Sequence, residues 1–419
     1  MIRRRVVTRG SGYRADMTPA ASTADQYFDV LVIGGGNAGI SAAARLIKKG
    51  ITDVAVIEPQ RVHTYRPLLS YVGGGQATLN DAERTQRSVT PEQCTWVQDT
   101  AISVDAPSQT VLCASGRTYR YRDLVLGPGL VPDADALPGV DAALESSAVA
   151  SNYVDRAEET WELVKSMPAR GRAVFTVPRA PVSCTGTTLK PLFLAAAHWQ
   201  KTGRLPGVDI SLVVDRPELL GVPDLDGRLY SLLADLDVRV LRTTAVTELD
   251  PEGRQISVTG ATGSVERLPY DMLHLVPPFR GPLWVELSGL SGADPRGLVD
   301  IDPHTFRHHK YPDIWAAGDG AAVATDPSGG ALRRQIAILV DNLIAAREGK
   351  ALAEYDGYTV APVAIDGHRL IAGEFDRAGT VESSLPSFVD PLKPRRSAWA
   401  FDRYGLPQMY WNLILKGRL

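Results

Sequence analysis

Residues 28–39 read Phe-Asp-Val-Leu-Val-Ile-Gly-Gly-Gly-Asn-Ala-Gly. The first six residues are mostly apolar and predict a short buried strand, and the pattern after the glycines predicts a helix over residues 40–49. Residues 53–58 predict the next strand. A strand, a glycine-rich turn, a helix and a second strand form the βαβ unit that binds dinucleotides. The stretch therefore predicts an α/β protein with a dinucleotide site near its N-terminal end.

Each glycine of the turn has a physical role. Gly34 permits the tight turn, Gly36 lets the backbone approach a pyrophosphate, and Gly39 allows the helix to pack closely on the strand. The helix N-terminus then faces the phosphates with its partial positive charge. Glu58 ends the next strand, where a carboxylate can accept both ribose hydroxyls. We expect these four residues to bind the cofactor.

Two later turns indicate FAD rather than NAD. Gly127-Pro128-Gly129 follows the strand at residues 123–126, and Gly318-Asp319 ends an apolar strand that begins at Ile314. A helix is expected after it, over residues 331–348. A second strand that ends in Gly-Asp is typical of flavoproteins whose FAD domain is split by an inserted domain. We expect Asp319 to bind the ribityl chain.

A second α/β unit lies between these turns, with strands at 172–177 and 209–214 and a helix near 191–201. The turn after its first strand contains Pro178 and Pro181 but no glycine, so it cannot cradle a pyrophosphate as the first turn does. The fold class is therefore α/β, with two Rossmann-like doubly wound domains. The expected boundaries are an FAD domain at 25–130 and 290–350, a degenerate NAD-type domain at 131–289, and a C-terminal region at 351–419. Joints rich in proline and glycine, near 132–139 and 277–282, are expected to cross between the two sheets.

The composition excludes several classes of protein. The 419 residues carry a net charge of −3, so no global basic field argues for a nucleic-acid partner. Three cysteines are too few and too scattered for a disulfide framework or a zinc cluster, and we expect no metal site. Their odd number fits a reducing compartment.

Both ends of the chain are basic. The arginine-rich start is compatible with a transit peptide, but we favour a disordered tail over residues 1–24, or a true start at Met17. From Lys393 onward, basic residues alternate with Trp and Tyr, which suits a membrane interface. A tail that packs its aromatic side chains on the protein body is the alternative, and both interpretations stay open.

Six further segments make a family resemblance specific. The chain resembles the sulfide:quinone oxidoreductases from Tyr27 to Gly417, and in particular the branch that includes the mitochondrial enzyme. The resemblance implies a fold of two dinucleotide-binding domains, one FAD, and electron transfer from a sulfur species to quinone at a membrane surface. It places Cys184 beside the flavin ring as the catalytic residue, and we add Arg66 and Ala101 to the cofactor-binding residues. The segments that carry it are 58–67, 151–153, 181–186, 270–274, 355–359 and 409–412.

The chain departs from this family at the expected reaction centre. The family uses two cysteines near the flavin, and the position of the second is Ala361 here. The family's lysine-bearing segment after the Gly-Asp strand is replaced by residues 326–330, Asp-Pro-Ser-Gly-Gly. We therefore expect that the two-cysteine mechanism does not operate, and that either Cys184 acts alone, the substrate meets the flavin directly, or the scaffold serves another donor. The terminus of the following helix can lower the pKa of Cys184. Cys94 and Cys113 are expected to be inert thiols on strand-and-turn surface.

Three hypotheses follow. The leading one is an FAD-dependent oxidoreductase that passes electrons from sulfide or another thiol-type donor to a quinone. The alternatives are a flavoprotein dehydrogenase for a different donor or for NAD(P)H, and a non-catalytic flavin-binding redox sensor. We expect a cytoplasmic protein, with peripheral attachment to the inner face of the plasma membrane as an option, or a mitochondrial one in a eukaryote. An oligomer is compatible with all three hypotheses.

Overall fold

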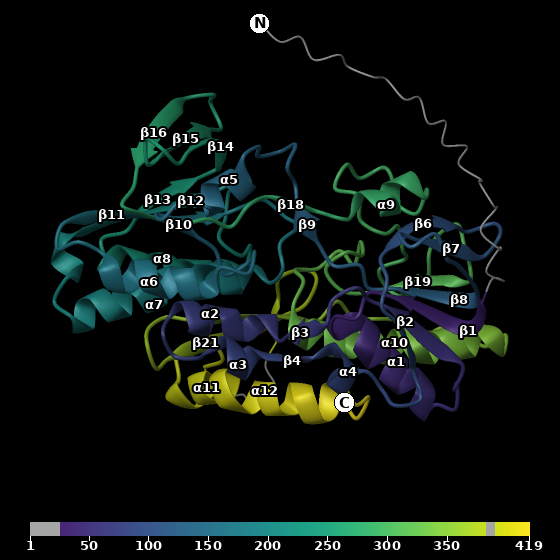
Figure 1. Cartoon of the computed structure of the whole chain (residues 1–419). Helices are drawn as coiled ribbons and strands as arrows, with labels where there is room; N and C mark the ends of the chain where they lie inside the picture. Colours follow the sequence, from purple (N-terminus) through teal and green to yellow (C-terminus); the bar gives the residue numbers. More distant parts are fainter. Residues whose placement is uncertain (1–25, 383–389) are drawn as a thin grey trace, which may run out of the picture.

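The computed structural model describes residues 26–382 and 390–419, so the tail expected at residues 1–24 lies outside the described residues. Within them, seven strands form the first sheet, in the order β5-β2-β1-β8-β7-β6 with β19 paired to β8 (Figure 1). The strands are β1 (Gln26–Ile33), β2 (Val54–Ile57), β5 (Thr95–Val97), β6 (Ala101–Asp105), β7 (Thr110–Cys113), β8 (Thr118–Leu126) and β19 (Ile314–Ala316).

The centre of this sheet is parallel, because β1 pairs in parallel with β2 and β8, and β8 with β19. Its strands are buried on both faces, which explains the unbroken apolar run in β1. Helices α1 (Asn37–Lys48) and α10 (Gly329–Arg347) pack against each other beneath the sheet (Figure 1). The carboxyl ends of β1, β8 and β19 therefore lie side by side, and so do the glycine turns that follow them.

A second, fully parallel sheet confirms the second α/β unit. Its order is β10-β17-β11-β12-β13. Helix α7 begins six residues earlier than the predicted helix and contains Pro191 in its interior. The elements are β10 (Val149–Ala150), β11 (Gly171–Val177), β12 (Val208–Val214), β13 (Arg239–Arg242), β17 (Met272–His274), α5 (Val140–Leu144), α6 (Ala157–Ser166), α7 (Thr185–Lys201) and α8 (Pro223–Asp235).

The two chain segments that join the sheets pair with each other. Strand β9 (Val131–Pro132) runs antiparallel to β18 (Phe279–Arg280), a pairing that the sequence did not predict. An antiparallel sheet lies at the outer end of the second unit, formed by β14 (Thr244–Asp250), β15 (Gln255–Gly260) and β16 (Val265–Pro269). The short helix α9 (Leu283–Leu287) packs on β6.

The C-terminal region covers both units from below (Figure 1). It contains the antiparallel sheet β20 (Thr359–Ala364), β21 (Leu370–Phe375) and β22 (Val381–Glu382). Four helical segments then follow one another without a break, and we call them the C-terminal helical layer: α11 (Arg396–Ala400), η3 (Phe401–Gly405), α12 (Leu406–Met409) and η4 (Tyr410–Ile414). Above this layer in Figure 1 lie β3 (Val62–Thr64), β4 (Glu83–Thr85), η1 (Arg66–Leu68), α2 (Leu69–Gly73), α3 (Leu79–Ala82) and α4 (Gln86–Val89).

Candidate functional site

The three glycine turns at the ends of β1, β8 and β19 touch one another. A Cβ added at Gly34 would lie 2.3 Å from the carbonyl oxygen of Gly127, and one at Gly39 would lie 1.8 Å from that of Gly34. A Cβ at Gly320 would lie 2.4 Å from the carbonyl oxygen of Gly129. These contacts leave no room for side chains, so the three turns form one closely packed edge at the carboxyl ends of parallel strands.

The same edge has the shape that a dinucleotide requires. Gly36 has no atom within 4 Å of its added Cβ, so its face of the turn is open at the N-terminus of α1. Glu58 lies beside it, with Oε2 accepting from the Gly35 N–H at 2.7 Å and Oε1 from the Gln60 N–H at 2.8 Å. An open glycine, a helix N-terminus and an adjacent carboxylate are the groups that approach a pyrophosphate and a ribose, so these residues fit FAD.

Asp319 and Arg66 meet near this edge. Asp319 follows β19, and the Ser183 side chain hydrogen-bonds to it. Burial raises the pKa of Asp319, whereas the Arg66 charge acts in the opposite direction. Arg66 donates to the Tyr153 carbonyl at 2.6 Å and lies 3.3 Å from Asp155. Ala101 begins the edge strand β6, opposite Cys113, and its role at the cofactor stays a prediction.

Cys184 lies on a strained turn immediately before α7. Its φ is 57°, in the left-handed region that side chains other than glycine rarely adopt. The Tyr153 hydroxyl lies 3.1 Å from the Ser183 carbonyl oxygen and 3.2 Å from that of Cys184, and the Thr187 hydroxyl donates to Cys184 Sγ at 3.2 Å. The turn is thus held from both sides, with the sulfur fixed above the first turn of the helix.

Two aspartates flank Cys184 through its sequence neighbours. Ser183 connects to Asp319, whereas Thr185 donates its N–H to Asp326 Oδ2 at 3.1 Å and its hydroxyl to Asp326 Oδ1. Our expectation of a lowered thiol pKa was wrong: burial, and next the Asp326 charge, raise the pKa of Cys184 to about 11. The helix terminus does not offset the loss of solvent around the sulfur.

Cys184 is the only one of the three cysteines near these aspartates. Cys94 and Cys113 are buried in the core of the first sheet, not on its surface as expected, and burial raises the pKa of each to about 12. Ala361 is fully buried, and a Cβ added at Gly186 would lie 2.9 Å from the Ala361 Cβ. The Cys184 Sγ lies 4.0 Å from the neighbouring Val360 carbonyl oxygen. The methyl group of Ala361 therefore fills the place on β20, next to the start of α7, where the family has its second cysteine.

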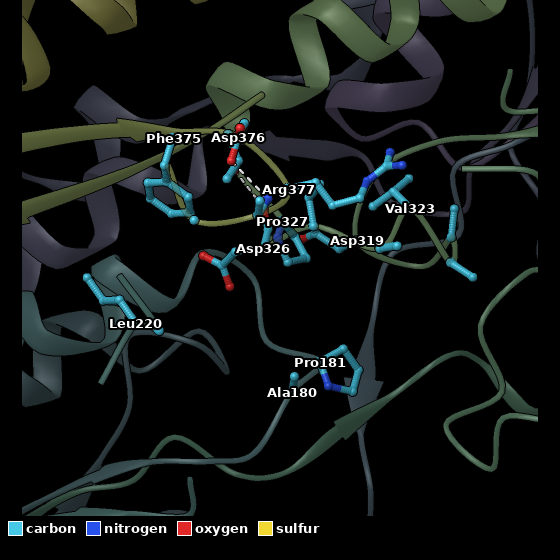
Figure 2. Close-up of a pocket in the computed structure, with 18 of the residues that line it drawn as sticks. Ala180, Pro181, Leu220, Asp319, Val323, Asp326, Pro327, Phe375, Asp376 and Arg377 are labelled. Carbon is cyan, nitrogen blue, oxygen red and sulfur yellow. Dashed lines mark hydrogen bonds between the residues drawn. The ribbon is translucent and has the colours of Figure 1, made fainter. Parts of the chain in front are cut away.

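A cavity of about 440 Å³ opens beside this turn. Figure 2 shows the Asp326 carboxylate between Leu220 on one side and the turn at Asp376 and Arg377 on the other, with Pro181 below. Asp319 also lines the cavity, so the space extends from the solvent side to the residue expected at FAD. Sequence reasoning missed Asp326 as a site residue, although its segment is a departure from the family.

Beneath the same helix lies a buried ion pair that sequence reasoning also missed. Lys190 Nζ lies 2.8 Å from Asp402 Oδ2, and their side chains are 0% and 5% exposed. The Tyr71 hydroxyl donates to the same carboxylate oxygen at 2.6 Å. This cluster ties α7, which begins directly after Cys184, to the C-terminal helical layer.

The C-terminal helical layer combines features of both interpretations of the basic tail. Tyr410 is buried and its hydroxyl lies 2.6 Å from His63 Nε2, while His63 Nδ1 lies 2.9 Å from the Gly35 carbonyl oxygen. Phe401 and Tyr404 are 51% and 56% exposed. In the described part of the chain, no helix is both long enough and apolar enough to span a membrane.

Comparison with known proteins gives a consistent result. The profile of the pyridine nucleotide-disulphide oxidoreductase family matches residues 28–338. The mitochondrial sulfide:quinone oxidoreductase of Mus musculus is 30% identical over 99% of this chain and 92% of its own length. That of Dictyostelium discoideum is 31% identical over 93% and 86%. The structure of the sulfide:quinone oxidoreductase from Aquifex aeolicus superposes with a TM-score of 0.78 at 19% identity, covering 94% of this chain and 92% of that one.

Proposed function

The chain belongs to the sulfide:quinone oxidoreductases, a family of FAD-dependent enzymes, and from this premise we propose that it passes electrons from sulfide, or another thiol-type donor, through FAD to a quinone. The observation that carries the proposal is the position of Cys184 between Ser183, which hydrogen-bonds to Asp319, and Thr185, which hydrogen-bonds to Asp326, because both aspartates line the 440 Å³ cavity. A thiol close to a cavity of that size is what oxidation of a small sulfur compound requires.

The residues that would hold FAD are the glycines of the first turn, Glu58 and Asp319, with Arg66 and Ala101 as further proposed contacts. FAD supplies a two-electron acceptor when it is bound. Asp319 is held by Ser183, so the group expected at the ribityl chain and the reactive sulfur are positioned by adjacent residues. This connection between Asp319 and the Cys184 turn supports a donor that reacts at Cys184, next to the residues expected at FAD.

We further propose that Cys184 works without a second cysteine. The donor step is then H₂S + Cys184–SH → Cys184–S–SH + 2e⁻ + 2H⁺, in which one S–S bond forms and two S–H bonds break. FAD, when bound, would accept both electrons and one proton, and the other proton would leave the site. An acceptor thiol RSH then removes the outer sulfur as RSSH and restores the Cys184 thiol. Ala361 supports this scheme, because it cannot supply the second sulfur of a disulfide.

The exposed aromatic residues of the C-terminal helical layer support peripheral attachment to a membrane. Phe401 and Tyr404 are exposed, and Lys393, Arg395 and Arg396 precede them. Aromatic rings beside cations suit the headgroup region of an anionic bilayer. Attachment there would bring the protein close to a quinone dissolved in the apolar part of the same bilayer. The mitochondrial relatives support the mitochondrial option for location over a cytoplasmic one.

Anaerobic visible spectroscopy of the purified flavoprotein tests the proposed function. We expect sulfide to bleach the flavin, a soluble quinone to restore its colour, and Cys184→Ser to abolish the bleaching without loss of FAD. We expect no bleaching by NADH, because the β11–α7 turn lacks the glycines that cradle a pyrophosphate. A wild-type flavin that dithionite reduces but sulfide does not would refute the proposal.

A further inference from the structure

We propose that Asp326 is a catalytic residue that accepts the proton released when a sulfur donor ionises in the cavity; this role rests on the proposed function. The step is H₂S + Asp326–COO⁻ → HS⁻ + Asp326–COOH, in which an S–H bond breaks, an O–H bond forms and no electron moves. Asp326 thus receives the proton that leaves the site in the overall donor reaction.

The position of Asp326 is the first argument. Its side chain lines the 440 Å³ cavity that also reaches Asp319, so a small donor in that space can contact the carboxylate (Figure 2). Both carboxylate oxygens are also bonded to Thr185, the residue after Cys184. A donor that contacts Asp326 is therefore held close to the turn that carries the reactive sulfur.

The charged groups around Asp326 are the second argument. Burial, and the nearby Asp319, raise its pKa to about 6, although Thr185 and the Arg216 charge act in the opposite direction. Cys184 and Tyr153 also face the carboxylate, and burial raises the pKa of each, so neither loses a proton near neutral pH. Asp326 thus combines a place in the cavity, next to Thr185, with a pKa that suits proton exchange near neutral pH.

Arg216 lies near Asp326 without pairing with its carboxylate directly, and this arrangement is the third argument. Arg216 donates through Nη1 to the Thr185 hydroxyl at 3.1 Å and through Nε to the Pro178 carbonyl at 3.1 Å. It reaches Asp326 through Thr185 and forms no direct ion pair with it among the described contacts. The carboxylate therefore keeps enough basicity to accept a proton, which a close bidentate arginine would remove.

The test compares wild-type protein with Asp326→Asn, which keeps one acceptor oxygen for Thr185. Rate constants for flavin bleaching by sodium sulfide are measured anaerobically by stopped flow at several pH values. We expect the ratio of wild-type to variant rate to be near one at about pH 5 and to rise above the pKa of Asp326, up to about 10²-fold, because only the ionised carboxylate accepts a proton. At pH values above the pKa of H₂S the ratio should fall again, because the donor then arrives as HS⁻ and needs no base.

Two further variants separate chemistry from structure. Asp376→Asn removes another carboxylate that lines the cavity, and we expect it to leave the ratio at one throughout. Asp326→Glu restores a carboxylate, and we expect it to recover part of the rate together with the pH dependence. A ratio that is the same at every pH would mean that Asp326 only caps the turn, and would overturn the proposal.

An infrared titration of the protein without cofactor gives a readout independent of activity. The wild-type minus Asp326→Asn difference spectrum should show a carboxyl group that titrates near pH 6. Its absence would overturn the proposal. If sulfide fails to bleach the wild-type flavin at every pH, the proposed function fails and this role with it, whereas bleaching with a constant ratio overturns the role of Asp326 alone.

Discussion

Asp402→Asn should destabilise the protein strongly, because it leaves the Lys190 ammonium buried without a counter-charge. The Lys190 side chain is 0% exposed, Asp402 is 5% exposed, and their charged atoms lie 2.8 Å apart. Water cannot reach Lys190 to replace the lost charge. Removing one partner of such a pair costs about 3–5 kcal/mol.

Thermal unfolding measures this cost. At about 2 °C per kcal/mol for a large domain, we expect the midpoint to fall by about 6 °C or more. Glu162→Gln is the matched control, because it breaks the exposed Lys165–Glu162 pair of the same 2.8 Å length, and exposed pairs contribute about 0.2–1 kcal/mol. Lys190→Met combined with Asp402→Asn should recover part of the loss, since no unpaired charge then remains.

The outcome bears on function through α7. The pair joins this helix to the C-terminal helical layer, so its loss should also loosen the turn at Cys184 and reduce the fraction of protein that retains FAD. A midpoint for Asp402→Asn within the range of the Glu162→Gln control would refute the reasoning, because Lys190 would then find water or another partner.

Three other predictions follow from the site. Gly34→Ala should abolish FAD binding, because its Cβ would lie 2.3 Å from a carbonyl oxygen, whereas Gly227→Ala, in open space on α8, should leave the flavin absorbance unchanged. Phe401→Ser with Tyr404→Ser should lower co-sedimentation with anionic vesicles by about tenfold or more, since two exposed rings leave the interface; unchanged binding would contradict attachment through this layer. Alkylation of Cys184 should keep rising up to about pH 11, and at pH 8 it should be about 10²-fold slower than for an ordinary thiol; a plateau below pH 8 would show a thiolate that burial does not suppress.

The sequence predicted best those features that are local in the chain. The β1-α1-β2 unit, the turns at Gly127 and Gly318, and the two joints rich in proline and glycine all follow from short stretches whose residue types dictate their conformation. The predicted helix missed the first six residues of α7 and began at Pro191, a residue type that is over-represented at the first position of helices. Tertiary packing allows it inside α7 here.

The features that the sequence did not predict depend on distant residues. Asp326 lies 141 residues from Thr185, and Asp402 lies 212 residues from Lys190, so no periodicity or motif connects them. The pKa of Cys184 was misjudged for the same reason: the helix terminus is visible in sequence, but the burial and the Asp326 charge that raise the pKa are not.

The most direct test of single-cysteine chemistry is mass spectrometry of the protein after anaerobic reaction with sulfide, without an acceptor thiol, followed by alkylation and digestion. The proposed scheme predicts one added sulfur atom on the peptide that contains Cys184, and removal of that sulfur when an acceptor thiol is supplied. A disulfide or trisulfide between Cys184 and another cysteine of the chain would contradict it.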